Sequence, residues 1–209
     1  TIFGSAGNDI IDGAGGADVI DYTGLGQSID VLDTGDILKG GSLGTDSINN
    51  IETIIADSAV TGNSIDGEDN VGVSFTVDLA AETLDVAVEG GPVIQKTIVN
   101  FDDVFGTAGD DTITGDDQAN ILTGGNGDDT IAGGAGADTI NGVGSEFGID
   151  DFDTLTGGAD ADTFILGTAG NVFYEGIGFA EIVDFATGVD GIQLAGTFDD
   201  YDFSSNASG

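Results

Sequence analysis

Aspartate side chains recur at a fixed spacing between Gly106 and Asn141, and their carboxylates are the groups in this chain that could do chemistry. The stretch consists of four nine-residue lines without a gap, GTAGDDTIT, GDDQANILT, GGNGDDTIA and GGAGADTIN. The sixth position of these lines holds Asp111, Asn120, Asp129 and Asp138. Carboxylates that are brought close together repel one another unless a cation lies between them. The spacing therefore predicts a series of cation sites.

The available donors are all oxygen atoms, and this favours calcium. The chain contains no His and no Cys, the residues that zinc and copper sites normally use. Ca²⁺ accepts roughly six to eight oxygen ligands from carboxylates and backbone carbonyls, whereas Mg²⁺ prefers a smaller octahedron and retains its waters. We therefore expect several Ca²⁺ ions as the cofactor of this chain.

The two halves of each line predict the structure that would position the carboxylates. The first six residues are rich in Gly, whose tolerance of positive φ favours a tight turn. The last three form a short strand whose middle residue points alone to one face; these residues are Ile113, Leu122, Ile131 and Ile140. One buried aliphatic side chain per line contributes roughly 1.5–3 kcal/mol, while ordering each residue costs roughly 1–2 kcal/mol. So thin a core needs a second source of stability, and cation binding is the candidate.

The lines match the pattern G-G-x-G-x-D-x-U-x, with U a large aliphatic residue, and the chain therefore resembles the RTX (repeats-in-toxin, hemolysin-type) calcium-binding β-roll family. The resemblance implies an all-β fold, a right-handed parallel β-roll or β-helix solenoid of nonapeptide repeats. Two lines would make one revolution, so that each line stacks on the next but one. Each ion would lie between stacked lines, among carbonyls of positions two and four of the first line, carbonyls of positions one and three of the second, and both acids at position six.

Applied to this chain, the resemblance implies four calcium sites in the main array. Their ligands would be Thr107, Gly109 and Asp111 with Gly124, Asn126 and Asp129; Asp116, Gln118 and Asn120 with Gly133, Ala135 and Asp138; Gly125, Gly127 and Asp129 with Gly148, Asp150 and Asp153; and Gly134, Gly136 and Asp138 with Gly157, Ala159 and Asp162. The amide of Asn120 should weaken the second site. An insertion at about residues 143–147 interrupts the register before the third.

The same register occurs at the N-terminus. The sixth residues of the lines at 4–12, 13–21, 22–30 and 31–39 are Asp9, Asp18, Gln27 and Asp36. The aliphatic positions of these lines are Ile11, Ile20, Ile29 and Leu38. Because Asp36 follows Asp18 by two lines, we expect this pair to hold an ion and Asp9, which would face Gln27, to be a weaker ligand. Residues 1–3 match the strand of a line whose turn is missing, so we interpret the chain as a piece of a longer protein.

Longer strands and an aromatic tail complete the predicted solenoid. Between residues 49 and 105 the nine-residue pattern is no longer kept. Apolar segments there predict strands at 51–56, 74–79, 83–88 and 93–99. We interpret this section as a wider rung or a β-hairpin excursion from one continuous coil. The aromatic residues after 165 are expected to cap the solenoid, because an open end exposes unpaired strand edges. The predicted divisions are N-terminal repeats at 1–48, a middle section at 49–105, the main array at 106–165 and the capping segment at 166–209.

The charge of the chain restricts its partners. Its 39 acidic and 2 basic residues give a net charge of −37. This charge makes nucleic acids and anionic membrane surfaces unfavourable partners, and no apolar run approaches the roughly 20 residues of a membrane span. We expect calcium as the partner, no nucleic acid, no membrane insertion, and self-association or filament assembly through the open N-terminal end. The resemblance implies an extracellular, secreted or cell-surface location, reached by type I secretion.

Catalysis within this chain is not expected. Without His, neither an HExxH zinc site nor a Ser-His-Asp or Cys-His arrangement can be built. The carboxylate pairs that a glycosidase would need are accounted for by calcium. We therefore interpret the chain as a non-enzymatic extracellular module that folds on binding Ca²⁺ and acts as a structural, adhesive or surface-layer element. The alternative is the C-terminal accessory module of a secreted enzyme of the protease, lipase or alginate epimerase type, all of which the family contains.

Overall fold

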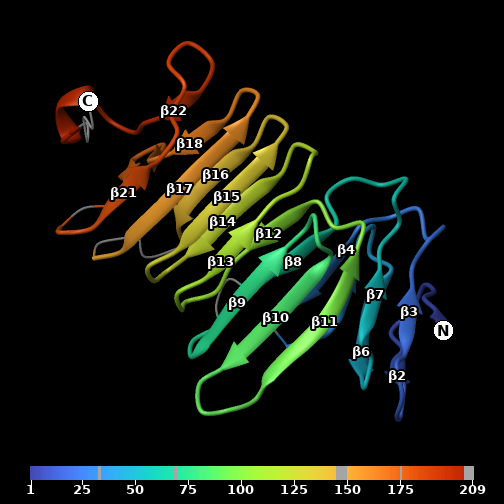
Figure 1. Ribbon diagram of the computed structural model, residues 1–209. Coiled ribbons are helices and arrows are strands. Elements are labelled where there is room, and N and C mark those ends of the chain that lie inside the picture. Colours follow the sequence, from blue (N-terminus) through green and yellow to red (C-terminus); the bar gives the residue numbers. More distant parts are fainter. Residues whose placement is uncertain (33, 68–69, 145–149, 175, 205–209) are drawn as a thin grey trace.

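The computed structural model is built almost entirely of short β-strands that stack into a two-sheet coil (Figure 1). It describes residues 1–32, 34–67, 70–144, 150–174 and 176–204. Within these residues there are two ten-stranded sheets, a two-stranded sheet and one 3₁₀ helix, η1 (Phe198–Asp200). The two termini lie at opposite ends of the coil, so the molecule is a rod of stacked rungs.

The strands of the two sheets alternate along the chain. The first sheet runs in the order β1 (Ile2–Phe3), β3 (Val19–Asp21), β7 (Thr53–Ile55), β11 (Val93–Val99), β10 (Thr83–Val88), β9 (Val73–Asp78), β13 (Thr112–Thr114), β15 (Thr130–Ala135), β17 (Phe152–Ala159) and β21 (Phe179–Ile182). The second runs β2 (Ile10–Asp12), β6 (Gly44–Asn49), β5 (Ile37–Lys39), β4 (Ile29–Leu32), β8 (Ser64–Asp66), β12 (Asp103–Phe105), β14 (Ile121–Gly125), β16 (Thr139–Val143), β18 (Thr163–Ile165) and β22 (Gly191–Gln193). The small pair is β19 (Gly167–Thr168) with β20 (Asn171–Val172).

The main array confirms the predicted β-roll of nine-residue lines. Ile113 of β13 lies beside Ile131 of β15 in parallel register, and Leu122 of β14 lies beside Ile140 of β16. Each line therefore stacks on the next but one, as expected. These aliphatic side chains are buried and form one continuous core with those of the other rungs. The glycine-rich halves of the lines form the turns that connect the two sheets.

Two antiparallel meanders interrupt the parallel coil. In the first sheet β9, β10 and β11 form a meander between β7 and β13, which confirms the predicted strand at 83–88 and the interpretation as a hairpin excursion. In the second sheet β4, β5 and β6 form another. The nine-residue stacking predicted for residues 22–39 is therefore wrong. Leu38 was expected inside but is 40% exposed, because β5 alternates and buries Ile37 and Lys39 instead.

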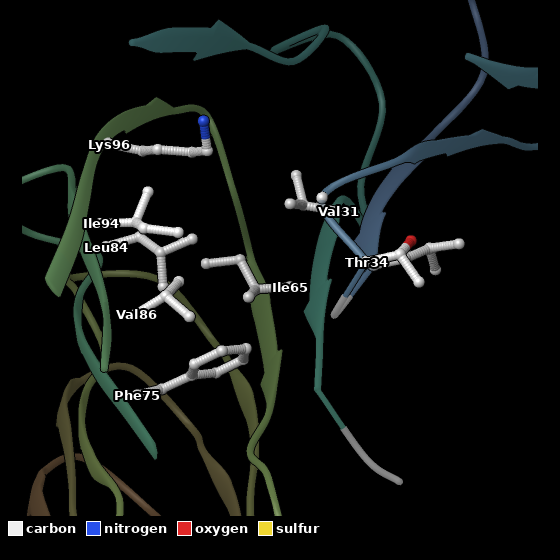
Figure 2. Close-up of a pocket in the computed structure, with 10 residues that line it drawn as sticks. Val31, Thr34, Ile65, Phe75, Leu84, Val86, Ile94 and Lys96 are labelled. Atoms are coloured by element: carbon white, nitrogen blue, oxygen red, sulfur yellow. The ribbon is translucent and has the colours of Figure 1, made fainter. Parts of the chain in front are cut away.

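An apolar gap separates the two meanders (Figure 2). Side chains of β9, β10 and β11 line one side of it, and Val31 and Thr34 lie on the other. Lys96 stands at its rim, where its Nζ donates a hydrogen bond to the carbonyl of Ile51 at 2.7 Å. The meanders thus widen the coil at its middle without adding a separate core.

The last rung ends both sheets, and the capping role expected for the aromatic segment stays a prediction, because Phe179, Phe185 and Phe203 are exposed. β21 pairs with β17, and β22 pairs with β18. Phe164 and Phe173 are buried, and the ring of Phe179 packs edge-on against Phe152 at 5.1 Å between centroids. In the described residues, no helix is long and apolar enough to cross a membrane.

Candidate metal centre

Carboxylates at the sixth position form a ladder along one edge of the coil. The amide of Asp111 donates a hydrogen bond to Oδ1 of Asp129 at 2.8 Å, and the amide of Asp129 donates to Oδ1 of Asp153 at 2.9 Å. The carboxylate of Asp111 in turn accepts from the amide of Phe75 on β9. Each acid therefore bonds the backbone of the preceding rung with one oxygen. This leaves its second oxygen available for another partner.

A second ladder runs along the opposite edge. Here Oδ1 of Asp138 accepts from the amide of Asn120 at 2.8 Å, and Oδ1 of Asp162 accepts from the amide of Asp138 at 3.0 Å. The ladder ends at Asp190, whose Oδ1 accepts from the amide of Asp162 at 3.1 Å. Sequence reasoning missed Asp190, because insertions place it 28 residues after Asp162. The signal that could have found it is the sequence DGI at 190–192, whose Ile192 pairs with Phe164.

Three oxygens of these ladders are buried without a hydrogen-bond partner, and they are the strongest sign of a cation site. They are the Oδ2 atoms of Asp129, Asp138 and Asp162, and the residues are only 1–2% exposed. A buried polar atom, and still more a buried charge, is costly unless it is paired. A hard cation would supply the missing partner. The residues present therefore fit calcium here.

The first glycine of each line makes room for the folded-back carboxylate. A Cβ placed on Gly124 would lie 2.2 Å from Oδ2 of Asp129, and one placed on Gly133 would lie 2.3 Å from Oδ2 of Asp138. Gly157 has the same relation to Asp162, at 2.3 Å. A side chain at any of these positions would fill the space beside the unpartnered oxygen. The glycine at position one is thus required by the acid at position six.

Burial also makes these carboxyl groups hard to ionise. Desolvation, with the neighbouring Asp153 and Asp111 as additional repulsive charges, raises the pKa of Asp129 to about 9. Desolvation likewise raises the pKa of Asp111, Asp138 and Asp153 to about 6, and it raises the pKa of Asp162. Groups that lack a compensating positive charge behave in this way. A bound cation would reverse the effect by favouring the ionised form.

The backbone groups predicted as ligands lie between closely stacked turns. A Cβ on Gly125 would be 1.9 Å from the carbonyl oxygen of Thr107, and one on Gly134 would be 2.3 Å from that of Asp116. The carbonyl oxygen of Gln118 lies 2.4 Å from a Cβ placed on Gly136. The carbonyl carbon of Gly109 likewise lies close to a Cβ placed on Gly127. The turns can stack this tightly only because the second line carries glycine. Among the described residues no three acidic side chains cluster around one point, so any ion in the array would depend on such carbonyls.

The array begins with residues whose oxygens are already satisfied by the chain. Oδ2 of Asp111 accepts from the amide of Thr107, and the hydroxyl of Thr107 bonds the same carboxylate at 3.1 Å. In the second ladder the side-chain amide nitrogen of Asn120, Nδ2, donates a hydrogen bond to the backbone carbonyl of Asp102 at 2.7 Å. Asn120 thus presents a hydrogen-bond donor at the sixth position, where the other lines of the main array present a negatively charged carboxylate. That the second site is weaker stays a prediction.

The third predicted site departs from its expected ligands. Gly148 lies outside the described residues, and Asp150 is exposed. The residue in the position of the first glycine is Gly142, because a Cβ there would lie 2.2 Å from Oδ2 of Asp153. Gly142 precedes Asp153 by 11 residues, whereas Gly124 precedes Asp129 by five. The hydroxyl of Tyr174 donates to Oδ2 of Asp153, so this oxygen has a partner within the chain. In the fourth site Ala159 pairs with Ala135, as the register requires.

At the N-terminus the predicted pair of Asp18 and Asp36 is wrong. β3, which follows Asp18, pairs with β1 and β7 of the first sheet, whereas Asp36 precedes β5 of the second sheet. The neighbour of Asp18 is Glu52, whose Oε2 accepts from the amide of Asp18 at 2.7 Å. Sequence reasoning missed Glu52 because it lies outside the nine-residue register. Asp9 does not face Gln27 either, since β2 pairs with β6 and brings Asp9 to Asp46.

Comparison with protein families identifies the repeats of this chain. The model of the RTX calcium-binding nonapeptide repeat matches in four copies, over residues 1–24, 105–140 and 147–173. No curated protein matches the sequence. Among solved structures, the extracellular lipase LipA from Serratia marcescens is similar over 98% of this chain and 35% of its own, with 17% identity and a TM-score of 0.24. This chain thus spans about a third of the length of that lipase.

Proposed function

We propose that the main array of this chain, whose repeats match the RTX calcium-binding nonapeptide repeat, folds around calcium ions held between successive turns. The single observation that carries the proposal is the set of three buried oxygens without a partner, on Asp129, Asp138 and Asp162. The net charge of −37 supports it, because a compact state of so acidic a chain is destabilised by its own repulsion.

The ladders suggest which groups would hold the ions. Asp129, Asp138 and Asp162 would supply the carboxylates, because each keeps an oxygen without a partner, together with carbonyls of the stacked turns. The ions would supply positive charge to oxygens that the chain leaves unpaired. The chain itself positions the carboxylates by bonding one oxygen of each to the preceding rung, and the glycines exclude side chains from the gap. Binding of this kind is coupled to folding, since the turns that form the cage are not assembled in the unfolded chain.

Circular dichroism in calcium and in EGTA tests the proposal. We expect strong β-sheet signal in calcium and loss of the signal of the main array in EGTA, with recovery when calcium is restored. Magnesium at the same concentration serves as the control, and we expect it to be a poor substitute. A β-sheet signal that is the same in EGTA and in calcium would reject the proposal.

We place this folding outside the cell. The resemblance to the RTX family implies a secreted protein, and extracellular calcium modules bind at roughly 10⁻⁴–10⁻³ M. A chain with that affinity would remain unfolded at cytosolic calcium and would fold after export. Calcium titration followed by circular dichroism gives the midpoint, and saturation below micromolar calcium would contradict this part of the proposal.

For the biological role we propose a structural, adhesive or surface-layer element. Exposed apolar side chains at the N-terminal end support self-association, since Phe3 and Ile10 lie on the outermost strands of the two sheets. Sedimentation at high protein concentration in calcium measures this, and a strict monomer would remove the idea. The second candidate is the accessory module of a secreted enzyme. A catalytic domain in the same polypeptide would favour that candidate, and further repeats or adhesin domains would favour the first.

A further inference from the structure

The N-terminal rungs, in which β6 stacks on β2, contain a buried lysine. Its partner is an aspartate that takes part in a ladder like those of the main array. The chain has only two basic residues. One of them, Lys39, forms an ion pair with Asp46, and both side chains are completely buried. A buried ion pair is uncommon and is tolerated only where the remaining polar atoms are also bonded. The pair lies beside the amide of Asp9, where the rungs of the main array place an acid of the ladder.

Asp46 occupies the place in its rung that Asp129 occupies in the main array. Ile11 of β2 lies beside Ile48 of β6 in parallel register, as Ile113 lies beside Ile131. Counting back two residues places Asp9 beside Asp46. The amide of Asp9 donates to Oδ1 of Asp46 at 3.1 Å, which repeats the bond between the amide of Asp111 and Oδ1 of Asp129. The two acids therefore stand in equivalent positions.

The two acids differ in what satisfies them. Oδ2 of Asp129 is buried and has no partner. At Asp46, Oδ1 also accepts from Nζ of Lys39, and Oδ2 accepts from the hydroxyl of Tyr22 at 2.8 Å. Nζ of Lys39 donates a further hydrogen bond, at 2.6 Å, to the carbonyl of Gly7, the fourth residue of its line. The ammonium thus contacts a turn carbonyl and an acid, the two kinds of group that the array offers to a cation.

The lysine reaches this place because the coil is locally antiparallel. β5 runs between β4 and β6 and buries its first and third residues, Ile37 and Lys39. A parallel nine-residue line presents only one inward side chain and could not deliver both. The meander therefore brings a positive charge into the gap between the turns that contain Gly7 and Asp46.

We propose that the ammonium of Lys39 is a built-in counterion that replaces calcium in the first rung, so that this end of the coil folds without metal. The residues at Asp9 and Asp46 do not fit a calcium ion, because the oxygens that would bind it already bond Lys39 and Tyr22. A tethered charge is present at every calcium concentration. The N-terminal rungs would then form a preassembled end against which the calcium-dependent array can stack.

Hydrogen exchange by mass spectrometry, in calcium and in EGTA, tests the inference on the full chain. In EGTA we expect the wild-type peptides that cover β2 and β6 to exchange at least about tenfold more slowly than those of residues 106–165, a ratio that local opening energies can easily reach. Lys39→Met keeps most of the stem and removes the charge. We expect it to abolish the slow exchange of β2 and β6 in both calcium and EGTA, while the array in calcium is unchanged.

The other lysine provides the matched control. Lys96→Met removes the second basic residue, whose Nζ bonds only the carbonyl of Ile51 among the contacts of the described residues, and β2 and β6 should stay protected in it. Lys39→Arg, which keeps the charge, should retain part of the protection. Rapid exchange of β2 and β6 in wild-type protein in EGTA would overturn the inference, and so would unchanged protection in Lys39→Met. If instead the array stays protected in EGTA, the proposed calcium folding fails, while the comparison of Lys39→Met with Lys96→Met still decides the role of Lys39.

Discussion

The N-terminal rungs and the main array have the same parallel ladder of acids but neutralise it in different ways. In the array, Asp129, Asp138 and Asp162 each keep a buried oxygen without a partner inside the chain. In the N-terminal rungs, the equivalent acid Asp46 is bonded by Lys39 and Tyr22. We therefore expect the array to depend on an ion from solution, whereas the N-terminal rungs carry their own positive charge. Stability that depends on calcium and stability that does not would then be combined in one coil.

The difference in charge coincides with a difference in strand direction. In the array each nine-residue line has one inward side chain, and that side chain is apolar and belongs to the core. No inward position remains there for a basic side chain, so the positive charge would have to come from an ion. The N-terminal section delivers Lys39 on β5, an antiparallel strand with two inward positions. A section of this coil that follows the regular repeat would therefore need calcium, and a section that carries its own cation must depart from the repeat.

Removal of Asp46 should give the largest effect. Asp46→Ala leaves the buried ammonium of Lys39 without its partner, and breaking a buried ion pair in this way costs about 3–5 kcal/mol. We expect the N-terminal rungs to lose stability in calcium and in EGTA alike, and faster hydrogen exchange of β2 and β6 measures this loss. Asp129→Ala is the counterpart, because it should weaken the array in calcium but not in EGTA. Restoration of β2 and β6 by added calcium in Asp46→Ala would contradict the comparison.

A methyl group at the first glycine of a line should have the next largest effect. In Gly124→Ala the new Cβ would lie 2.2 Å from Oδ2 of Asp129 and 2.6 Å from the carbonyl oxygen of Gly142. Overpacking of this kind typically costs about 1–3 kcal/mol. Gly15→Ala in the N-terminal rungs is the matched control, since no atom lies within 4 Å of its Cβ. Thermal unfolding in calcium should show a lower midpoint for the first variant only, and equal midpoints would mean that the turns are not stacked as described.

The sequence predicted the regular part of the coil well, because there the pattern and the structure have the same period. Nine-residue spacing placed Ile113, Leu122, Ile131 and Ile140 in the core, and all four are buried. It also placed the acids of the main array in stacked turns. The prediction was confirmed in the main array, where consecutive rungs are parallel and each line repeats the same contacts.

The sequence failed where the chain leaves that period. Leu38 and Asp36 matched the nine-residue register by chance, while the alternation in β5 follows the two-residue period of an ordinary strand. Glu52 and Asp190 take ladder positions through pairings that insertions shift by irregular amounts. The Lys39–Asp46 pair joins residues of two antiparallel strands, and no spacing rule of the repeat connects them.

The position of an acid within its ladder should set how strongly calcium depends on it. Asp129 lies between Asp111 and Asp153 and so would face two ions, whereas Asp111 begins its ladder against β9. Asp129→Ala should therefore raise the calcium midpoint of folding by about tenfold more than Asp111→Ala does, about 1.4 kcal/mol, and should lower the cooperativity. Calcium titrations of both variants by circular dichroism measure this. Equal shifts, or a larger one for Asp111→Ala, would show that ions are not shared between rungs.

The smallest expected effect is a pH dependence of the array in the absence of calcium, between pH 5 and pH 7.5, that the N-terminal turns do not share. In the array, desolvation raises the pKa of Asp138 and Asp153 to about 6 and that of Asp129 to about 9. A group whose pKa is raised on folding contributes its stability below the unfolded pKa of about 3.9 and loses it as the pH rises through the folded value. Metal-free array structure should therefore be better protected at pH 5 than at pH 7.5.

In the N-terminal region the sign is reversed for Asp12 and Asp57. Hydrogen bonds lower the pKa of both carboxyl groups, chiefly from the side chain of Asn50 for Asp12 and from the amide of Ala59 for Asp57. Their contribution is present above the unfolded pKa and is lost only as the pH falls below about 4. Protection factors from hydrogen exchange in EGTA at pH 5 and pH 7.5, corrected for intrinsic exchange rates, should fall with rising pH for residues 106–165 and stay constant in the turns next to Asp12 and Asp57. A parallel fall in both regions would mean that the whole coil responds to overall charge repulsion, and not to the buried carboxyl groups of the array.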